Sequence, residues 1–375
     1  MRRLAALLAL PLLMTALPAA TAGPTAGGVA SDNVEYVGFV PFEVGSSTGA
    51  TIVGKYMYLT SWKNISIYDI SQPEAPALLD IEPIGFRFEN EDVATNGKIL
   101  IFSAELPQDV LYVYDVEDKT NITLLAELPG AGGHTTTCIL KCKWAYSSEG
   151  YITDLRNPAK PVKQEQDWKK LTGIQVGVHD LDEYKNGFAV ASTYSGPVPA
   201  IDVRNPLKPK VIASAEHPEN TPIIHSTAWP RGGKDRWLLV QAEQNAQTRC
   251  NDNDGGFQTF DTKGYKKTHT FHLADTFKLG NGTYTDGKPP ANGLGCSAHW
   301  FEAHPTFKNG GLVAIGYYEH GTRIVDVSSA GKIKEVGYFM PYGGSTSMAE
   351  WMTKDLIYAI DYTRGIDILR YNGKT

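Results

Sequence analysis

One short phrase returns along the chain and constrains the fold more than any other feature. In each copy an aspartate stands between apolar residues where a strand is expected to end. The six clear copies are Ile67-Tyr68-Asp69-Ile70, Val113-Tyr114-Asp115-Val116, Ile152-Thr153-Asp154-Leu155, Ala200-Ile201-Asp202-Val203, Thr259-Phe260-Asp261-Thr262 and Ile324-Val325-Asp326-Val327. A seventh, degenerate copy is Ile368-Leu369-Arg370-Tyr371. Successive copies lie 46, 39, 48, 59, 65 and 44 residues apart, a period typical of propellers and other repeat arrays.

The sequence around each copy predicts four β-strands in every repeat. Further strand-like runs precede the aspartate, for example Tyr56–Ser61, and a proline-containing turn such as Arg156–Pro161 follows it before another run. We expect each aspartate to cap its turn by accepting a backbone hydrogen bond. Four-stranded sheets that recur in this way stack around an axis, because each sheet buries both faces only against its neighbours. The sequence therefore predicts an all-β fold, a seven-bladed β-propeller.

The two ends of the repeat region predict how the ring closes. The last repeat stops at its third strand, Gly365–Tyr371, whereas the chain begins with a strand-like run, Glu35–Phe39, that resembles Glu335–Phe339 of the preceding repeat. We therefore expect the N-terminal strand, residues 34–40, to complete the last blade, so that the propeller spans residues 34–375. A pair of β-sandwiches is the alternative fold, but it does not explain the seven-fold repeat.

The first 22 residues have the three parts of a secretory signal peptide. Arg2-Arg3 is followed by an apolar stretch over residues 4–17 and by the small residues Ala20-Thr21-Ala22, an A-x-A cleavage signal. We expect a signal peptide over 1–22, a flexible N-terminal segment over 23–33 and a secreted, extracellular protein. The arginine pair leaves export by the twin-arginine route open.

Four cysteines in an exported chain predict two disulfides. Cys138 and Cys142 flank three residues at a predicted hairpin, close enough to form a bridge. Cys250 and Cys296 lie in the two largest insertions, which this topology sends to the same mouth of the ring. We therefore pair Cys138 with Cys142 and Cys250 with Cys296. The triplets that begin at Asn64, Asn121 and Asn281 are glycosylation acceptors if the source is a eukaryote.

Composition excludes several classes of protein. Of the 375 residues, 42% are hydrophobic and 20% charged, which excludes a disordered chain. The net charge of −6 argues against nucleic acid or an anionic membrane as the main partner. After the leader no apolar run approaches 18 residues, so no membrane span is expected.

The aspartate phrase resembles a known repeat. Arg323-Ile324-Val325-Asp326-Val327 is similar to the LVIVD repeat of a family of secreted propellers, and the resemblance covers nearly the whole mature chain. It implies the propeller fold but no particular activity, because one fold hosts many functions. A more distant analogy is to the selenium-binding and methanethiol-oxidase propellers, whose members hold copper with histidines near the axis.

Histidines fall in one column when the repeats are aligned on their aspartates. His134, His179, His225 and His304 precede the aspartates of repeats three to six by 20, 23, 36 and 22 residues, which places each at the start of an innermost strand. Side chains there converge on one mouth of the axial channel, and neutral imidazole binds copper and zinc. We predict that these four histidines bind one copper or zinc ion. Inherited repetition of a structural hydrogen bond is the alternative.

Other polar residues fall near the same mouth. Glu243, Glu91 and His320 are candidates for a further ligand or an acid–base group. The remaining residues expected there are Asp92, Glu105, His299, Met348 and Glu350, with Trp300 and Phe301 beside the entrance. His217, His269 and His272 fall in outer-strand regions and are interpreted as structural. Asp252–Gly256 resembles a calcium loop, but the closing Glu of an EF-hand is missing.

Two functions from different classes follow. The histidine-lined axial pocket is either a metal centre that oxidises or hydrolyses a small extracellular substrate, or part of a non-enzymatic scaffold with bracing histidines. In both cases a small-molecule or protein ligand is expected at the mouth of the axial pocket. The sequence contains no P-loop or dinucleotide fingerprint, and it leaves open whether the protein is an enzyme.

Overall fold

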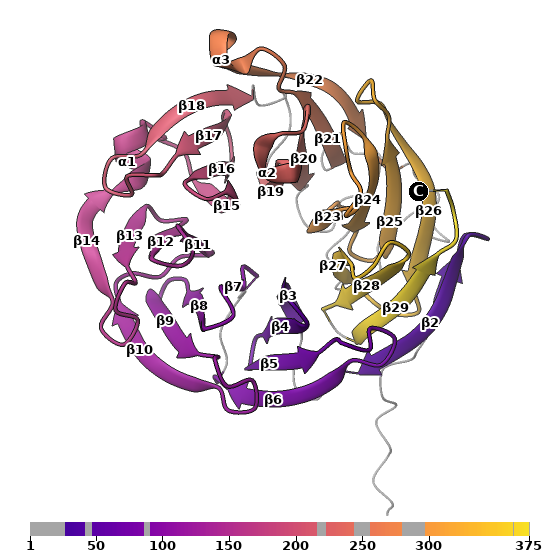
Figure 1. The fold of residues 1–375 in the computed structure, drawn as a ribbon, viewed down its shortest axis with the longest axis horizontal. Helices are drawn as coiled ribbons and strands as arrows, with labels where there is room; N and C mark the ends of the chain where they lie inside the picture. Colours follow the sequence, from indigo (N-terminus) through magenta and orange to yellow (C-terminus); the bar gives the residue numbers. More distant parts are fainter. Residues whose placement is uncertain are drawn as a thin grey trace, which may run out of the picture.

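The computed structural model is a ring of β-sheets arranged radially around a central axis, the arrangement of a β-propeller (Figure 1). The structure describes residues 27–41, 47–85, 91–215, 223–243, 256–279, 297–362 and 364–374. Within each repeat the chain starts at the centre of the ring and moves outward, strand by strand, to the rim (Figure 1). The prediction of an all-β fold is confirmed. The predicted signal peptide lies outside the described residues.

Three sheets consist of four consecutive antiparallel strands each. The first contains β3 (Ser47–Val53), β4 (Tyr56–Ser61), β5 (Asn64–Asp69) and β6 (Ala77–Pro83). The second contains β7 (Ala94–Thr95), β8 (Ile99–Ala104), β9 (Val110–Asp115) and β10 (Thr123–Pro129). The third contains β11 (Thr136–Ile139), β12 (Trp144–Ser147), β13 (Tyr151–Asp154) and β14 (Val162–Asp167).

The next two repeats share one sheet of eight strands. Its first half contains β15 (Val178–Lys185), β16 (Phe188–Thr193), β17 (Val198–Asp202) and β18 (Lys210–Ala215). Its second half contains β19 (Ile223–Ala228), β20 (Trp237–Glu243), β21 (Gly256–Asp261) and β22 (Thr270–Phe277). The halves meet through a short parallel pairing of the outer strands, in which Ser214 and Ala215 pair with Thr270 and Phe271.

The last two sheets take in strands from the N-terminal part of the chain. One contains β23 (Phe301–Ala303), β24 (Gly311–Gly316), β25 (Thr322–Val327) and β26 (Ile333–Pro341), with β1 (Gly28–Ala30) outside β26. The other contains β27 (Thr346–Trp351), β28 (Leu356–Asp361) and β29 (Gly365–Tyr371), with β2 (Val34–Pro41) outside β29. The expected pairing of residues 34–40 with Gly365–Tyr371 is therefore present.

Three residues of the segment 23–33, for which we predicted flexibility, form strand β1. Gly28, Val29 and Ala30 pair antiparallel with residues 339–341 of β26. The outer strand of a propeller sheet has an open edge whose N–H and C=O groups can bind another strand. This short N-terminal segment occupies that edge at β26.

The repeated aspartates cap turns as predicted. The carboxylates accept hydrogen bonds from the backbone N–H two residues further on, at 2.8–3.1 Å. The aspartates that do so are Asp69, Asp115, Asp154, Asp202 and Asp261. At two turns an arginine adds a forked ion pair, Arg156 with Asp154 and Arg204 with Asp202. Each cap fixes the chain direction between the third and the outer strand.

A register shift interrupts each pairing between a third strand and its outer strand. The shifts lie at Ile67/Tyr68, Leu124/Ala126, Tyr151/Thr153, Ala200/Ile201, Thr259/Phe260, Ile324/Val325 and Tyr36/Gly38. Bulges of this kind increase the local twist and make an outer edge a poor template for pairing with another chain. Their recurrence indicates that the sheets are copies of one unit.

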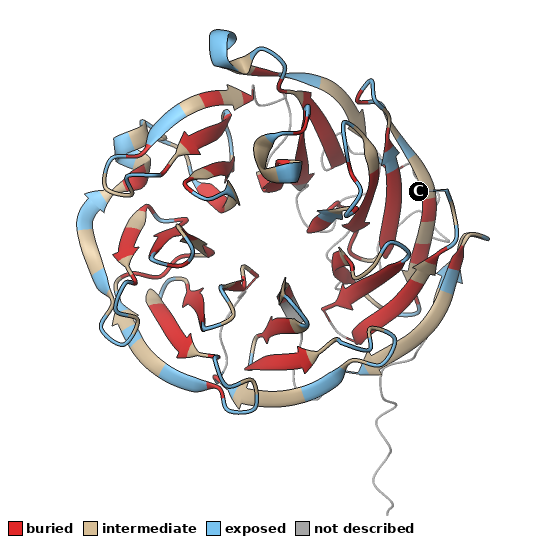
Figure 2. Ribbon diagram, in the orientation of Figure 1, coloured by how far each residue is buried: buried red, intermediate tan, exposed pale blue. Residues whose placement is uncertain are grey.

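The core lies between neighbouring sheets rather than in one central mass. Figure 2 shows buried residues on the inner strands and partly exposed residues along the rim. Phe102 of β8, for example, is fully buried, stacks on Tyr112 at 5.0 Å and packs against Tyr58 of the preceding sheet. Contacts of this kind join each sheet to the next, because burying such an aromatic side chain contributes about 2 kcal/mol.

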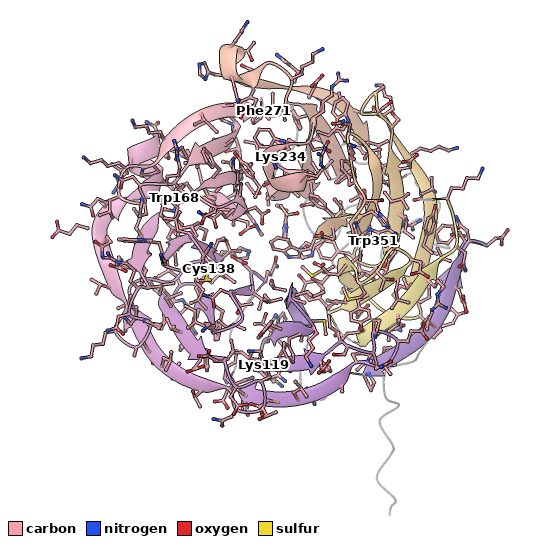
Figure 3. The ribbon with its side chains drawn as sticks, viewed as in Figure 1. Lys119, Cys138, Trp168, Lys234, Phe271 and Trp351 are labelled. Atoms are coloured by element: carbon pink, nitrogen blue, oxygen red, sulfur yellow. A yellow bond between two sulfur atoms is a disulfide. The ribbon has the colours of Figure 1, made fainter. Side chains whose placement is uncertain are left out.

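The helices are short, and one of them anchors an aromatic side chain. They are α1 (Trp168–Thr172), α2 (Pro230–Gly233) and α3 (Tyr265–Thr268). Trp168, labelled in Figure 3, is buried, stacks on Tyr146 at 5.5 Å and donates its indole N–H to the carbonyl of Ser147. Asp167 caps this helix by accepting from the Lys170 N–H.

The predicted disulfide between Cys138 and Cys142 is present, where β11 ends and the chain turns into β12. Cys138 is labelled in Figure 3. Cys250 and Cys296 lie outside the described residues, as do residues 252–255 of the loop that resembles a calcium site.

Candidate metal centre

Four imidazoles form an arc inside the ring, contributed by four consecutive repeats. His134 lies two residues before β11, His179 and His225 near the starts of β15 and β19, and His299 two residues before β23. Successive ring centroids are 4.5, 3.8 and 4.0 Å apart. The inner strands begin at this end of their sheets, around the axis of the ring. Histidines at equivalent strand starts therefore lie close together.

Glu91 provides the negative charge beside this arc. It is 4% exposed and lies three residues before β7. Its Oε2 atom is 3.1 Å from His225 Nε2 and 3.4 Å from His299 Nε2. The Trp300 indole N–H donates to the same oxygen at 3.2 Å, and the Tyr362 hydroxyl donates to Oε1 at 3.3 Å.

These neighbours keep Glu91 ionised. Burial raises the pKa of the Glu91 carboxyl, but the adjacent His299 and His225 outweigh burial and hold this pKa well below its usual value. Two further hydrogen-bond donors stabilise the carboxylate. A full negative charge is therefore fixed in a buried site lined by imidazoles.

The histidines at the ends of the arc are oriented by hydrogen bonds. His299 Nδ1 donates to the carbonyl oxygen of Ser347 at 2.7 Å, because a carbonyl can only accept. Its Nε2 atom therefore faces Glu91 either with a proton, as an imidazolium, or with a lone pair. A nitrogen lone pair that faces a carboxylate is stable only if a cation lies between the two. The bond to Ser347 fits this second case, because histidines that bind a metal through one nitrogen commonly donate the N–H of the other nitrogen to a backbone carbonyl.

At the other end, His134 Nδ1 is 3.3 Å from the Glu105 carboxylate, and its Nε2 is 2.9 Å from His179 Nε2. With the His134 proton on Nδ1, the short contact requires His179 to donate from Nε2. The buried Nδ1 atom of His179 then holds a lone pair, and it has no hydrogen-bond partner in the structure. Burial, followed by the proximity of His225 and His134, lowers the pKa of His179 well below its usual value, so this ring is neutral.

The donor set fits a transition-metal ion. Glu91, His179 and His225 each offer one ligand atom, and the three atoms lie within 4.8 Å of one another. Imidazole nitrogens with one carboxylate oxygen are accepted by both zinc and copper. An ion here would also satisfy the orphaned nitrogen of His179, whose burial without a partner is unfavourable.

Three of the four predicted histidines lie in this cluster, and His304 does not. His304 directly follows β23, where its Nε2 donates to the carbonyl of Lys354 and its Nδ1 accepts from the Thr306 N–H. It packs on Trp351, at the opposite end of β27 from Ser347, which contacts His299. With about 3.3 Å per residue, those two ends lie about 13 Å apart.

The place predicted for His304 is taken by His299. Alignment on Asp326 assigned His304 to the start of the inner strand, but β23 is only three residues long and His304 comes after it. The spacing from the aspartate therefore misplaced the column in this repeat. The sequence gave one other indication for this repeat, because it placed His299 near the same mouth of the axial channel.

The other predicted residues have different surroundings. Glu91 lies within the histidine cluster. Glu105 lies at its edge, where its carboxylate contacts His134. The backbone of Glu243 ends β20, but its side chain lies outside the described part of the structure. His320 is buried in the turn after β24, and burial together with the nearby Arg323 guanidinium lowers its pKa to about 3.

Aromatic side chains surround the imidazoles. Their ring centroids lie 4.6–5.8 Å from the nearest histidine ring. The four are Tyr194 beside His179, Trp300 beside His225, and Tyr318 and Tyr362 beside His299. The sequence gave no signal that Tyr194, Tyr318 and Tyr362 enclose a polar centre. They limit access of water and strengthen the electrostatic interactions inside.

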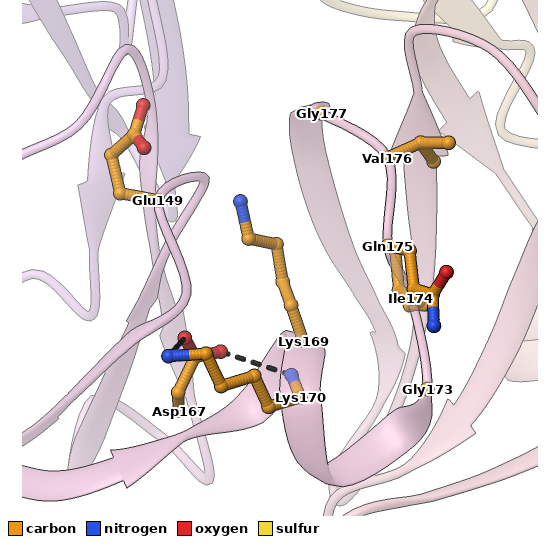
Figure 4. A pocket seen from close by; sticks show the side chains of 9 residues that line it. All are labelled: Glu149, Asp167, Lys169, Lys170, Gly173, Ile174, Gln175, Val176 and Gly177. Atoms are coloured by element: carbon orange, nitrogen blue, oxygen red, sulfur yellow. Dashed lines mark hydrogen bonds and ion pairs between the residues drawn. The ribbon is translucent and has the colours of Figure 1, made fainter.

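A cavity of about 160 Å³ lies directly beside the centre and is lined by Glu91 and Trp300. A separate hollow of about 520 Å³ lies at the surface beside α1, where Glu149, Asp167, Lys169 and Lys170 contribute side chains (Figure 4). Lys170 forms an exposed ion pair with Asp167 at 3.4 Å, an interaction of little energetic value. This hollow shares no lining residue with the histidine centre.

Solved structures with a similar fold include the following two. The β-propeller domain of Cps50 (Swd1) from Myceliophteria thermophila aligns with a TM-score of 0.61 and 16% identity, over 88% of this chain and 98% of that one. Raptor from Chaetomium thermophilum aligns with a TM-score of 0.60 and 12% identity, over 90% of this chain and 29% of that one. At this identity the likeness shows the fold alone.

No family model matches the sequence, and no curated protein is significantly similar to it. Among the described residues, no helix is both long and apolar enough to cross a membrane. The chain is therefore shown to be an all-β protein with a β-propeller fold and a buried histidine–glutamate cluster at the centre of its ring.

Proposed function

We propose that the histidine–glutamate cluster is a centre for one transition-metal ion, copper or zinc, in a secreted propeller that oxidises or hydrolyses a small extracellular substrate. The observation that carries the proposal is the convergence of Glu91, His179 and His225 within 4.8 Å in a buried site. These three residues hold the ion, with His134 and His299 beside them as further ligands or orienting groups. A bound ion supplies Lewis-acid chemistry as zinc, or electron exchange with the substrate as copper.

The side chains of the chain prepare the site for an ion in three ways. Hydrogen bonds to Ser347 and Glu105 orient the rings of His299 and His134. Trp300 and Tyr362 fix the Glu91 carboxylate. The surrounding aromatics exclude bulk water, so a bound ion experiences a low dielectric constant and interacts strongly with what enters the adjacent cavity.

The proposal includes a ring of seven blades of the LVIVD-repeat family, closed by β2. The eight-stranded sheet then counts as two blades, because only two residue pairs join its halves. Seven third-to-outer strand pairings with a bulge support this count. Secretion rests on the leader sequence over residues 1–22. It is tested by mass spectrometry of protein from the culture medium, which is expected to begin at residue 23.

The test of the metal centre is metal content per chain, measured on protein purified without a His-tag. We expect one zinc or copper ion per chain in the wild type, and less than about a fifth of that in His179→Ala and His225→Ala. His272→Ala is the matched control, because His272 is exposed on β22, and it is expected to retain the ion. A chelator is expected to lower the melting temperature of the wild type and of the control.

The scaffold function predicts a different result. If the wild type binds no metal after Cu²⁺ or Zn²⁺ is supplied, and a chelator leaves its melting temperature unchanged, the metal centre is refuted. The histidines are then bracing groups and the protein belongs to the class of non-enzymatic binding modules, with its ligand at the mouth of the axial pocket.

A further inference from the structure

The cavity beside the centre is strongly acidic. Besides Glu91, its lining includes four carboxylic side chains from four different repeats: Asp92, Asp182, Glu302 and Glu350. Asp92, Asp182 and Glu302 lie one or three residues further along the chain than Glu91, His179 and His299. The described lining contains no lysine, arginine or histidine. An anionic ligand would therefore meet no positively charged partner here, whereas a cation would be attracted.

The acidic side chains do not form a second metal site of their own. In the described part of the chain, the group of side chains whose ligand atoms converge within 4.8 Å is Glu91, His179 and His225. The carboxylates of the cavity are spread around its wall instead. Three of their oxygens do not come close enough together for the bonds of about 2.0–2.2 Å that a bare metal ion forms, but an ammonium group reaches further, because its hydrogen bonds are about 2.8 Å long.

The rest of the lining combines apolar side chains with three hydroxyl residues, Thr51, Ser226 and Thr227. Trp300, Phe301 and Met348 are each less than 10% exposed and line the cavity. Thr227 is 2% exposed, lines the same cavity, and its hydroxyl has no hydrogen-bond partner. A buried hydroxyl without a partner is unfavourable unless a ligand or water supplies one. The wall thus combines carboxylates, a free acceptor and a hydrocarbon surface.

The volume suits a small molecule. About 160 Å³ holds several water molecules or a short organic chain. The cavity also continues past Asp182, Thr227 and Glu302 into a second hollow of about 160 Å³ lined by Tyr184 and Trp229. A ligand therefore has a path along the channel toward Glu91.

We propose that this cavity binds a small aliphatic amine in its ammonium form, with the nitrogen among the carboxylates of Asp182, Glu302 and Glu350 and the hydrocarbon against Phe301 and Met348. As the substrate class of the metal centre this inference rests on the proposed function, but the binding step itself requires no metal ion. The Thr227 hydroxyl accepts one ammonium N–H. Carboxylates hydrogen-bonded to a cation form the stronger, charge-assisted class of hydrogen bond.

Electrostatics of the empty cavity agree with a cationic ligand. Burial raises the pKa of Glu302 to about 7, and burial together with Glu302 raises the pKa of Glu350 well above its usual value. Protons therefore neutralise part of these carboxyl groups, and a cation that enters can take their place. An ammonium group that enters is expected to displace protons from them.

Binding is tested by calorimetry with n-butylamine, n-butanol and butyrate as probes. We expect wild-type protein to bind n-butylamine at least tenfold more tightly than n-butanol, and butyrate not at all. Glu302→Gln and Glu350→Gln are expected to weaken amine binding about tenfold while leaving the weak alcohol binding unchanged. Glu165→Gln, a charge-matched change at an exposed position on β14, is expected to bind the amine like the wild type.

The measurement is made on the chelator-treated and on the metal-supplied protein, and metal content is determined in parallel. Equal affinity for amine and alcohol, or amine binding that Glu302→Gln and Glu350→Gln leave intact, overturns the inference. Thermal melts establish that both variants are folded. Replacing glutamate with glutamine preserves the shape of the side chain, so the variants change its charge alone. If the proposed metal centre is wrong, this is seen separately, because protein to which the metal was supplied then contains none.

Discussion

Hydrogen bonds to the backbone distinguish the roles of His299 and His304. His299 gives its Nδ1 proton to the carbonyl of Ser347, so its Nε2 atom faces the Glu91 carboxylate. His304 uses both ring nitrogens in bonds to backbone groups, at Lys354 and Thr306. Both rings are buried and lie five positions apart, yet only His299 can contribute to a metal centre.

This contrast gives a prediction for two variants. His299→Ala is expected to lower metal affinity at least tenfold, because it removes the Nε2 atom beside Glu91. His304→Ala is expected to keep one ion per chain but to lose about 1–3 kcal/mol of stability, since it removes two partly buried hydrogen bonds and the contact of the ring with Trp351. Metal titration and urea unfolding of both variants provide the check. Loss of the ion in His304→Ala with the ion retained in His299→Ala would reverse the assignment.

Glu302 gives a prediction about pH and stability. Its pKa in the folded protein is raised to about 7 by burial, whereas in the unfolded chain a glutamate titrates near 4.3. Between these values the folded state binds the extra proton, so this group costs stability as pH rises through that window and costs nothing below it. Glu302→Gln is therefore expected to stabilise the metal-free protein at pH 8 and to leave it unchanged at pH 4.

The gain at pH 8 should be about 1 kcal/mol or less. Protein atoms surround the Glu302 carboxyl group closely enough to raise its pKa, but water still reaches this residue and screens the effect. Urea unfolding at both pH values measures it, with Glu165→Gln as the control. Equal effects of Glu302→Gln at pH 4 and pH 8 would mean that the carboxyl is not perturbed.

At the scale of strands and turns, the repeat carried most of the predictable information. The aspartate phrase identified third strands and the caps that follow them, because an Asx turn needs a particular residue at a particular position. Inner strands carry no such requirement. Strand β7 has two residues and β23 has three, too few for a periodic pattern, so the position of His304 relative to β23 could not be inferred.

The acidic cavity was invisible to sequence reasoning for a related reason. Asp92 and Glu350 were expected near the mouth of the channel, but Asp182 and Glu302 had no motif or spacing to single them out. Only the radial arrangement brings side chains from repeats so far apart in sequence to one wall. The parallel pairing of β18 with β22 was equally unpredictable, since it joins the edges of two separate repeats.

The turn caps give a prediction at this scale. Asp115→Ala removes the acceptor for the Glu117 N–H, a bond of 2.8 Å, and is expected to cost about 1 kcal/mol. Glu117→Ala is the neighbouring control: it removes only an ion pair with Lys98 in which both side chains are about two-thirds exposed, so little change is expected. Urea unfolding compares the two. Equal stabilities would show that the repeated aspartate does not stabilise its turn.

At the scale of the whole molecule, the ring is what makes the centre possible. Each sheet buries its faces against its neighbours, and the imidazoles of four repeats meet only if the sheets hold a fixed order around the axis (Figure 1). Strand β2 brings the first residues of the propeller into the same sheet as its last strand, with Val34 opposite Tyr371 and Pro41 opposite Gly365. The geometry of the centre therefore depends on a pairing far from it in sequence.

Removal of residues 23–41 from the mature chain tests this dependence. Without β2 the edge of β29 is open, and Val34, which is buried with Leu369 and Tyr371, no longer covers that part of the core. An open edge beside exposed apolar residues promotes pairing with other chains. We expect the shortened protein to aggregate and its soluble fraction to melt well below the full mature chain.

Removal of residues 23–33 alone is the matched control, because it deletes β1 but leaves β2 and its pairing with β29 intact. We expect this shorter deletion to remain monomeric and to keep its metal content, with only a small decrease in melting temperature. Size-exclusion chromatography and thermal melting distinguish the two deletions. If the protein lacking residues 23–41 stayed monomeric and melted like the full mature chain, β2 would not be needed to close the ring, and the order of the histidines around the axis would have to be maintained by the contacts between sheets alone.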